Sequence, residues 1–196
     1  MVFKLGGKPK TTVLCIYSPT NYSPIEEIDD FYTTLRSTIE QIPPHNFLVL
    51  AGDFNSQLET DETMFSFNSK TNRNGELLAN FVQEFILFIS NTHFMKPKGQ
   101  MWTFEYPSGT RAQMDYVIFR KKWRYSVKDS RAYSSFSSVG SDQKIVSATV
   151  KLSLRSSKEA KPHPMKTVDL KEVSSNPVIS KEFSVQVLIN LGLFGH

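Results

Sequence analysis

The sequence predicts a layered α/β domain in which helices cover paired sheets. Two observations carry this prediction. Short β-branched and aromatic runs alternate with amphipathic segments over roughly the first half of the chain, and a hairpin pattern followed by one more strand comes afterwards. A length of 196 residues with 12% aromatic side chains also suffices for one domain with a sizeable core.

The predicted strands are apolar runs that end at Ser, Pro, Gly or Asn. They span residues 12–17, 47–51, 87–90 and 144–154, with two more at 101–105 and 113–119. The turn residues Pro107-Ser108-Gly109 separate the last two runs, which predicts a hairpin between them.

Two helices are predicted because apolar residues recur at helical spacing. The first begins with Ser23 as N-cap and Pro24 as first helical residue, and it stops at Pro43-Pro44. The second opens at Asn74-Gly75-Glu76 and continues to Phe85. The polar residues 56–73 are predicted to form a loop.

The composition divides the chain near residue 154. Residues 1–154 form the predicted domain. Residues 155–196 begin with a linker rich in Ser, Lys and Pro, and we expect a short tail after it that is either helical, over residues 179–193, or disordered.

Composition and charge restrict the classes of function. The single cysteine, Cys15, lies in an apolar run, which favours a core residue in a reducing, intracellular compartment, nuclear or cytoplasmic. No run of 18 apolar residues predicts a membrane span, so we expect no membrane partner. The net charge of +4 suits a polyanion without requiring one. No obligate protein partner can be inferred.

The tetrapeptide Gly52-Asp53-Phe54-Asn55 is the first candidate site. It follows a buried strand, and side chains two positions apart in extended backbone point to the same side, so Asp53 and Asn55 can converge on one ligand. A hard cation with a phosphate oxygen suits this pair, and so does an ordinary Asx-turn.

Further polar and aromatic residues occur near predicted strand ends and combine into a family pattern. They are Tyr17, Asp115, Asp142 and Trp102, and the motifs around them, in chain order, are Ile16-Tyr17-Ser18-Pro19-Thr20, Gly52-Asp53-Phe54-Asn55, Asn74-Gly75-Glu76-Leu77-Leu78, Asn91-Thr92, Trp102-Thr103, Gln113-Met114-Asp115-Tyr116 and Ser141-Asp142. Over residues 10–154 this order resembles the endonuclease/exonuclease/phosphatase superfamily, nearest to non-LTR retrotransposon endonucleases and craniofacial development protein 2-like sequences.

The resemblance implies a fold and a reaction. The fold is a truncated four-layered α/β sandwich of the DNase I-like type, with two packed mixed sheets flanked by helices. The reaction is Mg²⁺- or Mn²⁺-assisted hydrolysis of a phosphodiester in DNA, with charge on phosphate oxygens stabilised by the metal and by protein donors.

The resemblance also implies a role for each matched residue. Tyr17 would bind the scissile phosphate, Asp53 would activate water, and Asn55 would orient water and phosphate. Asp53, Asn55 and Asp142 would be the metal ligands. Asp115 would polarise the histidine that normally follows the Ser-Asp motif, and Trp102 would line the substrate groove.

Position 143 departs from the family pattern, because Gln143 stands where the family has that histidine. An imidazole can exchange a proton near neutral pH, whereas a primary amide cannot. Losing a positioned acid–base group costs on the order of 10²–10⁴ in rate.

The N-terminal part also departs from the family, since nothing before Tyr17 matches the family's first-strand Asn or its metal-binding Glu. The cation is then expected to be held weakly, if at all. Together with Gln143 this predicts a truncated copy whose nuclease activity is weak or absent.

A basic segment extends from Arg120 to Arg131 and holds six cations against one acid. Arg120, Lys121, Lys122 and Arg124 are therefore candidates for binding the phosphate backbone of the substrate, and a solvated strand end is the alternative. Two alternatives to a defective nuclease also remain open at the level of function. One is a non-catalytic nucleic-acid-binding remnant. The other is a hydrolase of phosphoinositide or sphingomyelin, against which the retroelement-like motifs argue.

Overall fold

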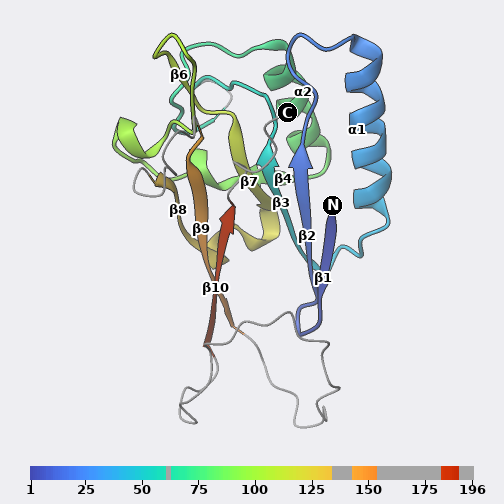
Figure 1. Cartoon of the computed structure of the whole chain (residues 1–196). Coiled ribbons are helices and arrows are strands. Elements are labelled where there is room, and N and C mark those ends of the chain that lie inside the picture. Colours follow the sequence, from blue (N-terminus) through green and yellow to red (C-terminus); the bar gives the residue numbers. More distant parts are fainter. Residues whose placement is uncertain (61–62, 134–142, 154–181, 190–196) are drawn as a thin grey trace.

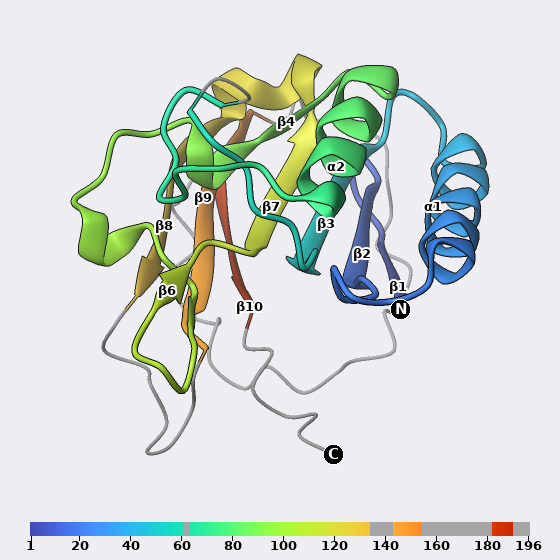
Figure 2. The ribbon, with the colours of Figure 1, turned by 90° about the horizontal axis from the view of Figure 1, so that it is seen from above.

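The computed structural model describes residues 1–60, 63–133, 143–153 and 182–189 (Figure 1). Helices α1 (Ile25–Glu40) and α2 (Arg73–Glu84) lie on one face of a five-stranded sheet, and a three-stranded sheet lies on its other face (Figure 2). No α-helix of the described residues covers the outer face of the smaller sheet. The α/β class is thus confirmed, with three of the four expected layers described.

The five-stranded sheet is mixed, as expected. Its order is β1-β2-β3-β7-β4, with strands β1 (Val2–Leu5), β2 (Thr11–Tyr17), β3 (Phe47–Asp53), β7 (Asp115–Arg120) and β4 (Leu87–Ile89). The β2–β3 pair is parallel, and α1 supplies the crossover that a parallel pair requires. The β1–β2, β3–β7 and β4–β7 pairs are antiparallel.

The three-stranded sheet corrects two expectations. Its strands β8 (Val127–Tyr133), β9 (Ile145–Ser153) and β10 (Glu182–Ile189) pair antiparallel in the order β10-β9-β8, so the described part of this sheet is not mixed. The helix predicted over residues 179–193 is wrong where it overlaps β10. The sequence from Phe183 to Val187 alternates apolar and polar residues, which is the period of a strand and not of a helix.

The predicted hairpin exists but is shorter than expected. It consists of β5 (Phe104–Glu105) and β6 (Arg111–Ala112), while most of the run 113–119 belongs to β7 of the large sheet. Five consecutive residues of β7 are buried, with Tyr116 and Ile118 packed in the core on the helix side of the sheet and Val117 and Phe119 packed between the two sheets, and this favours the interior over an isolated hairpin. The hairpin chemistry predicted at Pro107-Ser108-Gly109 is confirmed.

Helix starts differ from the prediction by one residue each. Pro24, not Ser23, is the N-cap of α1. The N-cap of α2 is Asn72, whose side chain accepts a hydrogen bond from the backbone N–H of Gly75 at 2.8 Å. Strands β1 and β8 were not predicted, because β1 is only four residues long and exposed throughout, and β8 holds three charged residues, Lys128, Asp129 and Arg131.

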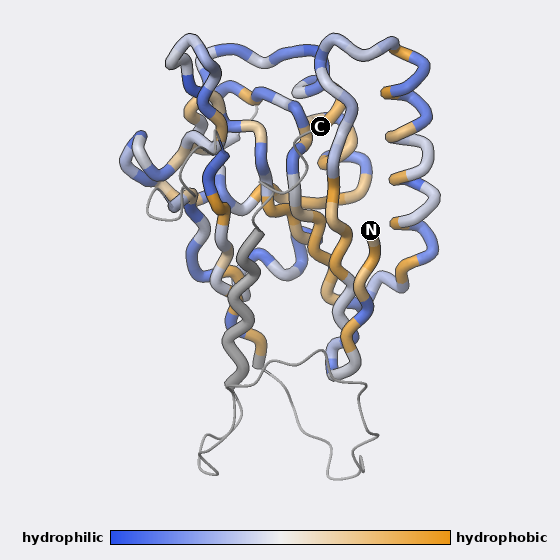
Figure 3. Tube along the Cα trace, in the orientation of Figure 1, coloured by the Kyte–Doolittle hydropathy of each residue, from blue (hydrophilic) through white to orange (hydrophobic). Residues whose placement is uncertain are grey.

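The central strand β3 is buried along its whole length and contributes to two cores. Leu48 and Leu50 pack with the apolar face of α1 and α2, whereas Phe47, Val49 and Ala51 pack between the two sheets. Figure 3 shows the apolar positions of α1 facing the sheet. Burial on both faces explains why residues 47–51 form an uninterrupted apolar run.

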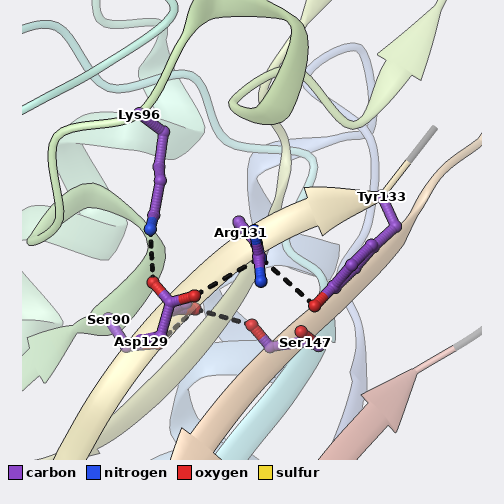
Figure 4. Close-up of polar contacts among 7 residues, drawn as sticks. Ser90, Lys96, Asp129, Arg131, Tyr133 and Ser147 are labelled. Carbon is purple, nitrogen blue, oxygen red and sulfur yellow. Dashed lines mark hydrogen bonds and ion pairs between the residues drawn. The ribbon is translucent and has the colours of Figure 1, made fainter.

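Polar contacts also link the two sheets. Ser90, in the 3-10 turn η1 (Ser90–Thr92) after β4, donates to the carbonyl of Val117 at 2.7 Å and lies 3.0 Å from the hydroxyl of Ser130. Ser130 in turn donates to the carbonyl of Ser147 at 3.0 Å (Figure 4). These buried hydroxyls have partners, as buried polar groups require. None of the helices described is long and apolar enough to cross a membrane.

Gly52 allows β2 and β3 to approach closely where they end. Its φ is +150°, and a Cβ placed there would lie 2.0 Å from the carbonyl oxygen of Ile16. Since the clash involves backbone, no side-chain rotation can relieve it. A glycine at this position is therefore a packing requirement for the two strands that carry Tyr17 and Asp53.

We expect Gly52→Ala to lower the free energy of unfolding by about 2 kcal/mol or more, from overpacking and an unfavourable φ. Thermal melting followed by circular dichroism would show this as a fall in Tm of roughly 5 °C or more. Gly6→Ala is the matched control, since nothing lies within 4 Å of a Cβ there. Equal melting temperatures for the two variants would contradict the packing role of Gly52.

Ile86 is a second strained position. It follows α2, has a φ of +51° and is 68% exposed, so its side chain gains little from packing. Left-handed backbone is unfavourable for a β-branched residue, and helices commonly place glycine there.

Ile86→Gly should therefore raise the free energy of unfolding by about 0.5–1 kcal/mol, measured by urea denaturation. Ile25→Gly is the control, because Ile25 is exposed at the first position of α1 and has no positive φ. The control should lower stability. A loss of stability in Ile86→Gly would contradict the prediction that the positive φ of Ile86 destabilises the folded chain.

Candidate functional site

Strand register places three of the predicted site residues in one row. Tyr17 at the end of β2 pairs with Asp53 at the end of β3, and Asp53 pairs with Asp115 at the start of β7. Residues directly opposite one another on neighbouring strands project from the same face of a sheet. For Asp53 and Asp115 this face is the one that carries Ala51 and Val117 toward the second sheet. The site therefore lies at one edge of the space between the sheets.

Asp53 and Asn55 form a tight local structure. The backbone N–H of Asn55 donates to Asp53 Oδ1 at 2.7 Å, and Asn55 has a φ of +47°, which asparagine tolerates better than most residues. The Asn55 side-chain amide donates to the carbonyl of Ser18 at 2.8 Å. The Asx-turn at Asp53 is thus present, and Asn55 also ties the loop after β3 to the loop after β2, whereas binding of a cation and a phosphate by this pair stays a prediction.

Burial governs the acidity of Asp53. Its side chain is 5% exposed, and this desolvation raises the pKa of Asp53 to about 6, although the hydrogen bond from the Asn55 backbone acts in the opposite direction. A carboxylate with such a pKa can take up and release a proton near neutral pH.

Tyr17 differs from its two neighbours because it is 70% exposed. Its hydroxyl is therefore accessible at the open end of the row, where it could donate to an oxyanion. The backbone around it is fixed, since the N–H of Ser18 donates to the carbonyl of Asp53 at 2.9 Å.

Asp115 is held through its backbone by Thr103 and Asn91. The hydroxyl of Thr103 accepts from the N–H groups of Met114 and Asp115 at 3.0 and 3.1 Å. The amide of Asn91 donates to the carbonyl of Asp115 at 2.9 Å and accepts from the N–H of Val117 at 3.1 Å. Thr103 and Asn91 were matched as motif residues, and only the structure gives them this supporting function.

Gln143 lies beside the same group. It bridges to Phe104, and the N–H of the next residue, Lys144, donates to the carbonyl of Thr103 at 2.8 Å. Thr103 therefore connects the segment of Gln143 with the start of β7, where Asp115 lies. Gln143 is half-buried, and its equivalence to the family's histidine stays a prediction.

Two cations, Lys144 and Arg111, contact the ring of Trp102. The Nζ of Lys144 lies 3.2 Å from the centre of this ring, and Arg111 Cζ lies 4.5 Å from it. Burial and the neighbouring Arg111 lower the pKa of Lys144 to about 8, while Glu105 acts the other way. The Trp102 ring is thus held near the site by its own chain, and no substrate contact is needed to explain its position.

The first turn of α2 supplies site contacts that the sequence did not predict. Arg73 donates to the carbonyls of Asn21 and Ser23 at 2.6 and 2.9 Å, and Asn74 donates to the carbonyl of Pro19 at 2.9 Å. These bonds hold the loop that follows Tyr17. Asn74 is fully buried at the start of α2, and the sequence carries no signal of that burial.

The basic residues lie away from this row. β7 runs antiparallel to β3, so Asp115 is at the site and Arg120 is at the opposite end of the same strand, roughly 17 Å away at about 3.4 Å per residue. Arg120 donates to the carbonyls of Ile42 and Pro43, and Lys122 to that of Pro44. The structure therefore does not bring Arg120, Lys121, Lys122 and Arg124 to the candidate site.

The metal ligands are only partly represented. Asp142 lies outside the described residues, and the residues that are described contain no group of three or more His, Cys, Asp or Glu able to hold a metal ion. Asp53 and Asp115 still offer two neighbouring carboxylates. Mg²⁺ often binds one or two carboxylates together with water and phosphate oxygens. The described residues fit a weak Mg²⁺ site completed by a phosphate, and not a complete protein site.

Comparison with known sequences identifies curated relatives but no matching family profile. The chain is 33% identical over 159 residues to craniofacial development protein 2 of Bos taurus and 32% identical to that of Tragulus javanicus, in each case over 78% of this chain. It spans about a quarter of the length of these relatives, 26% and 27% respectively.

Solved structures with a similar fold include nucleases. The endonuclease domain of TRAS1, a telomere-specific non-LTR retrotransposon, matches 73% of this chain and 57% of its own, with a TM-score of 0.52 and 17% identity. The 3′-5′ exonuclease NExo of Neisseria meningitidis matches 70% and 60%, with a TM-score of 0.53 and 16% identity. A Neisseria 3′ phosphatase NExo bound to a product DNA hairpin matches 74% and 62%, with a TM-score of 0.54 and 14% identity.

These likenesses confirm the resemblance carried by the motifs. The chain has the DNase I-like fold of the endonuclease/exonuclease/phosphatase proteins and is similar in sequence to craniofacial development protein 2.

Proposed function

We propose that the chain is a DNA-directed phosphodiesterase domain of retrotransposon origin whose Mg²⁺-dependent activity is weak. The observation that carries this proposal is the row of Tyr17, Asp53 and Asp115 across three adjacent strands. A phosphate approaching this edge would meet a hydroxyl donor, a carboxylate of raised pKa and a second buried carboxylate. The similarity in fold to nucleases and to a phosphatase bound to a DNA hairpin supports a nucleic-acid substrate.

Each residue of the row has a task that its surroundings suit. Tyr17, which is exposed, donates its hydroxyl to a phosphate oxygen. Asp53 accepts a proton from the attacking water, because its pKa of about 6 lies near the working pH. Asn55 holds the two loops together and keeps one amide N–H for water or phosphate, since its bond to Ser18 uses only the other.

A divalent cation would lie at Asp53, near Asp115 and Asn55. When bound, Mg²⁺ or Mn²⁺ would neutralise charge on the phosphate oxygens. Asp142 is proposed as a further ligand on the strength of its motif. With few carboxylates available, occupancy depends on the phosphate and is weak.

Gln143 limits the reaction. Its amide can donate to a phosphate oxygen but cannot transfer a proton to the leaving group. The chain would therefore bind the phosphate better than it cleaves the ester. The same observation favours a second candidate function, in which the domain binds nucleic acid without cleaving it.

Conversion of supercoiled plasmid to the nicked form in Mg²⁺ would test the proposal. We expect slow nicking by the full chain, none by Asp53→Asn, and nicking about 10²-fold faster or more in Gln143→His, because a proton-transfer group is restored. Gln113→His is the control for introducing a histidine, although Gln113 is buried and that variant must first be shown to fold.

The two candidate functions give different results in this assay. In one outcome, Gln143→His does not nick the plasmid although it binds the plasmid as well as the unmodified chain does. The site then lacks more than a proton donor, and the non-catalytic function is favoured. Strong nicking by the unmodified chain would instead refute the assigned defect.

The raised pKa of Asp53 also predicts a pH dependence of stability. Because the folded-state pKa lies above the unfolded value of 3.8, the folded chain binds more protons between about pH 4 and pH 6. The unfolding free energy should then fall across this range as pH rises, by up to about 3 kcal/mol.

Urea denaturation at pH 4.5 and pH 7 would measure this change. Asp53→Asn should flatten the dependence and be more stable than the unmodified chain above pH 6, because it carries no buried charge. Glu59→Gln, which removes a carboxyl outside the row of Tyr17, Asp53 and Asp115, is the control. A dependence that persists in Asp53→Asn would assign the titration to another group.

A further inference from the structure

The basic segment forms a surface of its own at the end of the large sheet away from the site. It is centred on the 3-10 helix η3 (Lys121–Ser126), which joins β7 to β8. Figure 2 shows η3, in yellow, beyond the arrowhead of β7 and at the opposite end from the arrowhead of β3. We name the side chains of Lys121, Arg124, Tyr125 and Lys128 the η3 surface.

Two cations of the segment are excluded from this surface because they reach away from η3 and bind carbonyls of the loop between α1 and β3. Arg120 binds the carbonyls of Ile42 and Pro43, and Lys122 binds that of Pro44, so both secure the loop between α1 and β3. The packing of Trp123 edge-on to the buried Phe47 is likewise structural. These residues set the position of η3 and leave Lys121 and Tyr125 exposed and Arg124 half-buried.

The remaining side chains point to a ligand with both phosphates and bases. Tyr125 is 77% exposed, and the guanidinium of Arg124 lies 4.6 Å from the centre of its ring. Lys128 is exposed and donates to the carbonyl of Tyr125 at 2.8 Å, which brings its charge to the backbone of that residue. Lys121 is exposed on the first position of η3. An aromatic ring with cations beside it is the arrangement on which nucleic-acid bases stack.

Nearby carboxylates do not neutralise this charge. Asp129 is bound by Lys96 at 2.5 Å and by Arg131 at 3.3 Å (Figure 4), and Glu84, at the end of α2, is bound by Arg36 at 3.0 Å. Within the described residues no ion pair is found for Lys121, Arg124 or Lys128. The three cations of the η3 surface therefore have no ionic partner within the described fold, and one of them, Arg124, lies against the exposed ring of Tyr125.

We infer that the η3 surface binds single-stranded nucleic acid, separately from the row of Tyr17, Asp53 and Asp115. The phosphates contact Lys121, Arg124 and Lys128, and a base stacks on Tyr125. A duplex offers the same phosphates but keeps its bases stacked inside, so the exposed ring favours the single strand. The inference does not depend on hydrolysis, because the two regions lie at opposite ends of β7.

Fluorescence anisotropy with a labelled oligothymidylate of about 16 nucleotides would test the inference on the full chain. The variant Lys121→Gln/Arg124→Gln/Lys128→Gln should reduce the slope of log affinity against log salt by about 2, since each phosphate contact to a single strand contributes about 0.7. Tyr125→Ala should weaken binding by roughly tenfold. Circular dichroism would verify that each variant is folded.

Controls separate this surface from general attraction and from the candidate site. Lys4→Gln/Lys70→Gln/Lys98→Gln removes the same charge from exposed lysines elsewhere and should leave the slope nearly unchanged. Asp53→Asn should bind the oligonucleotide at least as well as the unmodified chain while losing any nicking activity. Failure of the nuclease proposal would thus leave this result unaffected.

Three outcomes would overturn the inference. In the first, both triple variants lose affinity equally, which indicates non-specific attraction. In the second, a duplex of equal length binds as tightly as the single strand and Tyr125→Ala has no effect. In the third, vesicles of anionic phospholipid bind the chain more tightly than the oligonucleotide and through the same three cations.

Discussion

The structure depends on β3, which is buried on both faces and hydrogen-bonded to a strand on each side. On one side its parallel pairing with β2 requires the close backbone approach at Gly52. On the other side its antiparallel pairing with β7 fixes the register of Asp53 with Asp115. Since both neighbours are held by the same strand, the three site side chains lie in a row at one edge. Any change that shifts this register also disperses the row.

Burial of the Asp53 carboxylate has an electrostatic cost, and the same burial suits the role proposed for this residue. Burial of Asp53 disfavours its charged form and raises its pKa. A cation or a bound phosphate–metal complex would relieve this cost, which is how such carboxylates become catalytic ligands. The supporting bonds from Thr103, Asn91 and Asn55 keep the carboxylates in place without neutralising them, because most of these bonds go to the backbone.

The two ends of the large sheet have separate chemistry. The end with Asp53 carries carboxylates and a phenol, and the end with η3 carries cations and an exposed ring. A nucleic acid cleaved at one end and held at the other would have to run along the molecule. If hydrolysis is as weak as Gln143 implies, binding at η3 is the activity that depends least on the defects of the site.

The sequence by itself determined the alternation of strands and helices and the resemblance to the family, and it predicted the site residues. Periodicity and turn residues are local, and Gly52, Asp53 and Asn55 follow the apolar run that became β3. The tertiary structure decided which residues meet. It placed Tyr17, Asp53 and Asp115 in register, because pairing between strands far apart in the chain depends on their shared core. Arg120 and Lys122 were predicted to bind substrate, but in the structure they bind carbonyls of the loop between α1 and β3. The reason is that β7 leads away from the site toward Arg120. Strand β10 replaced part of the predicted helix because its neighbour β9 offered backbone partners that the sequence does not show.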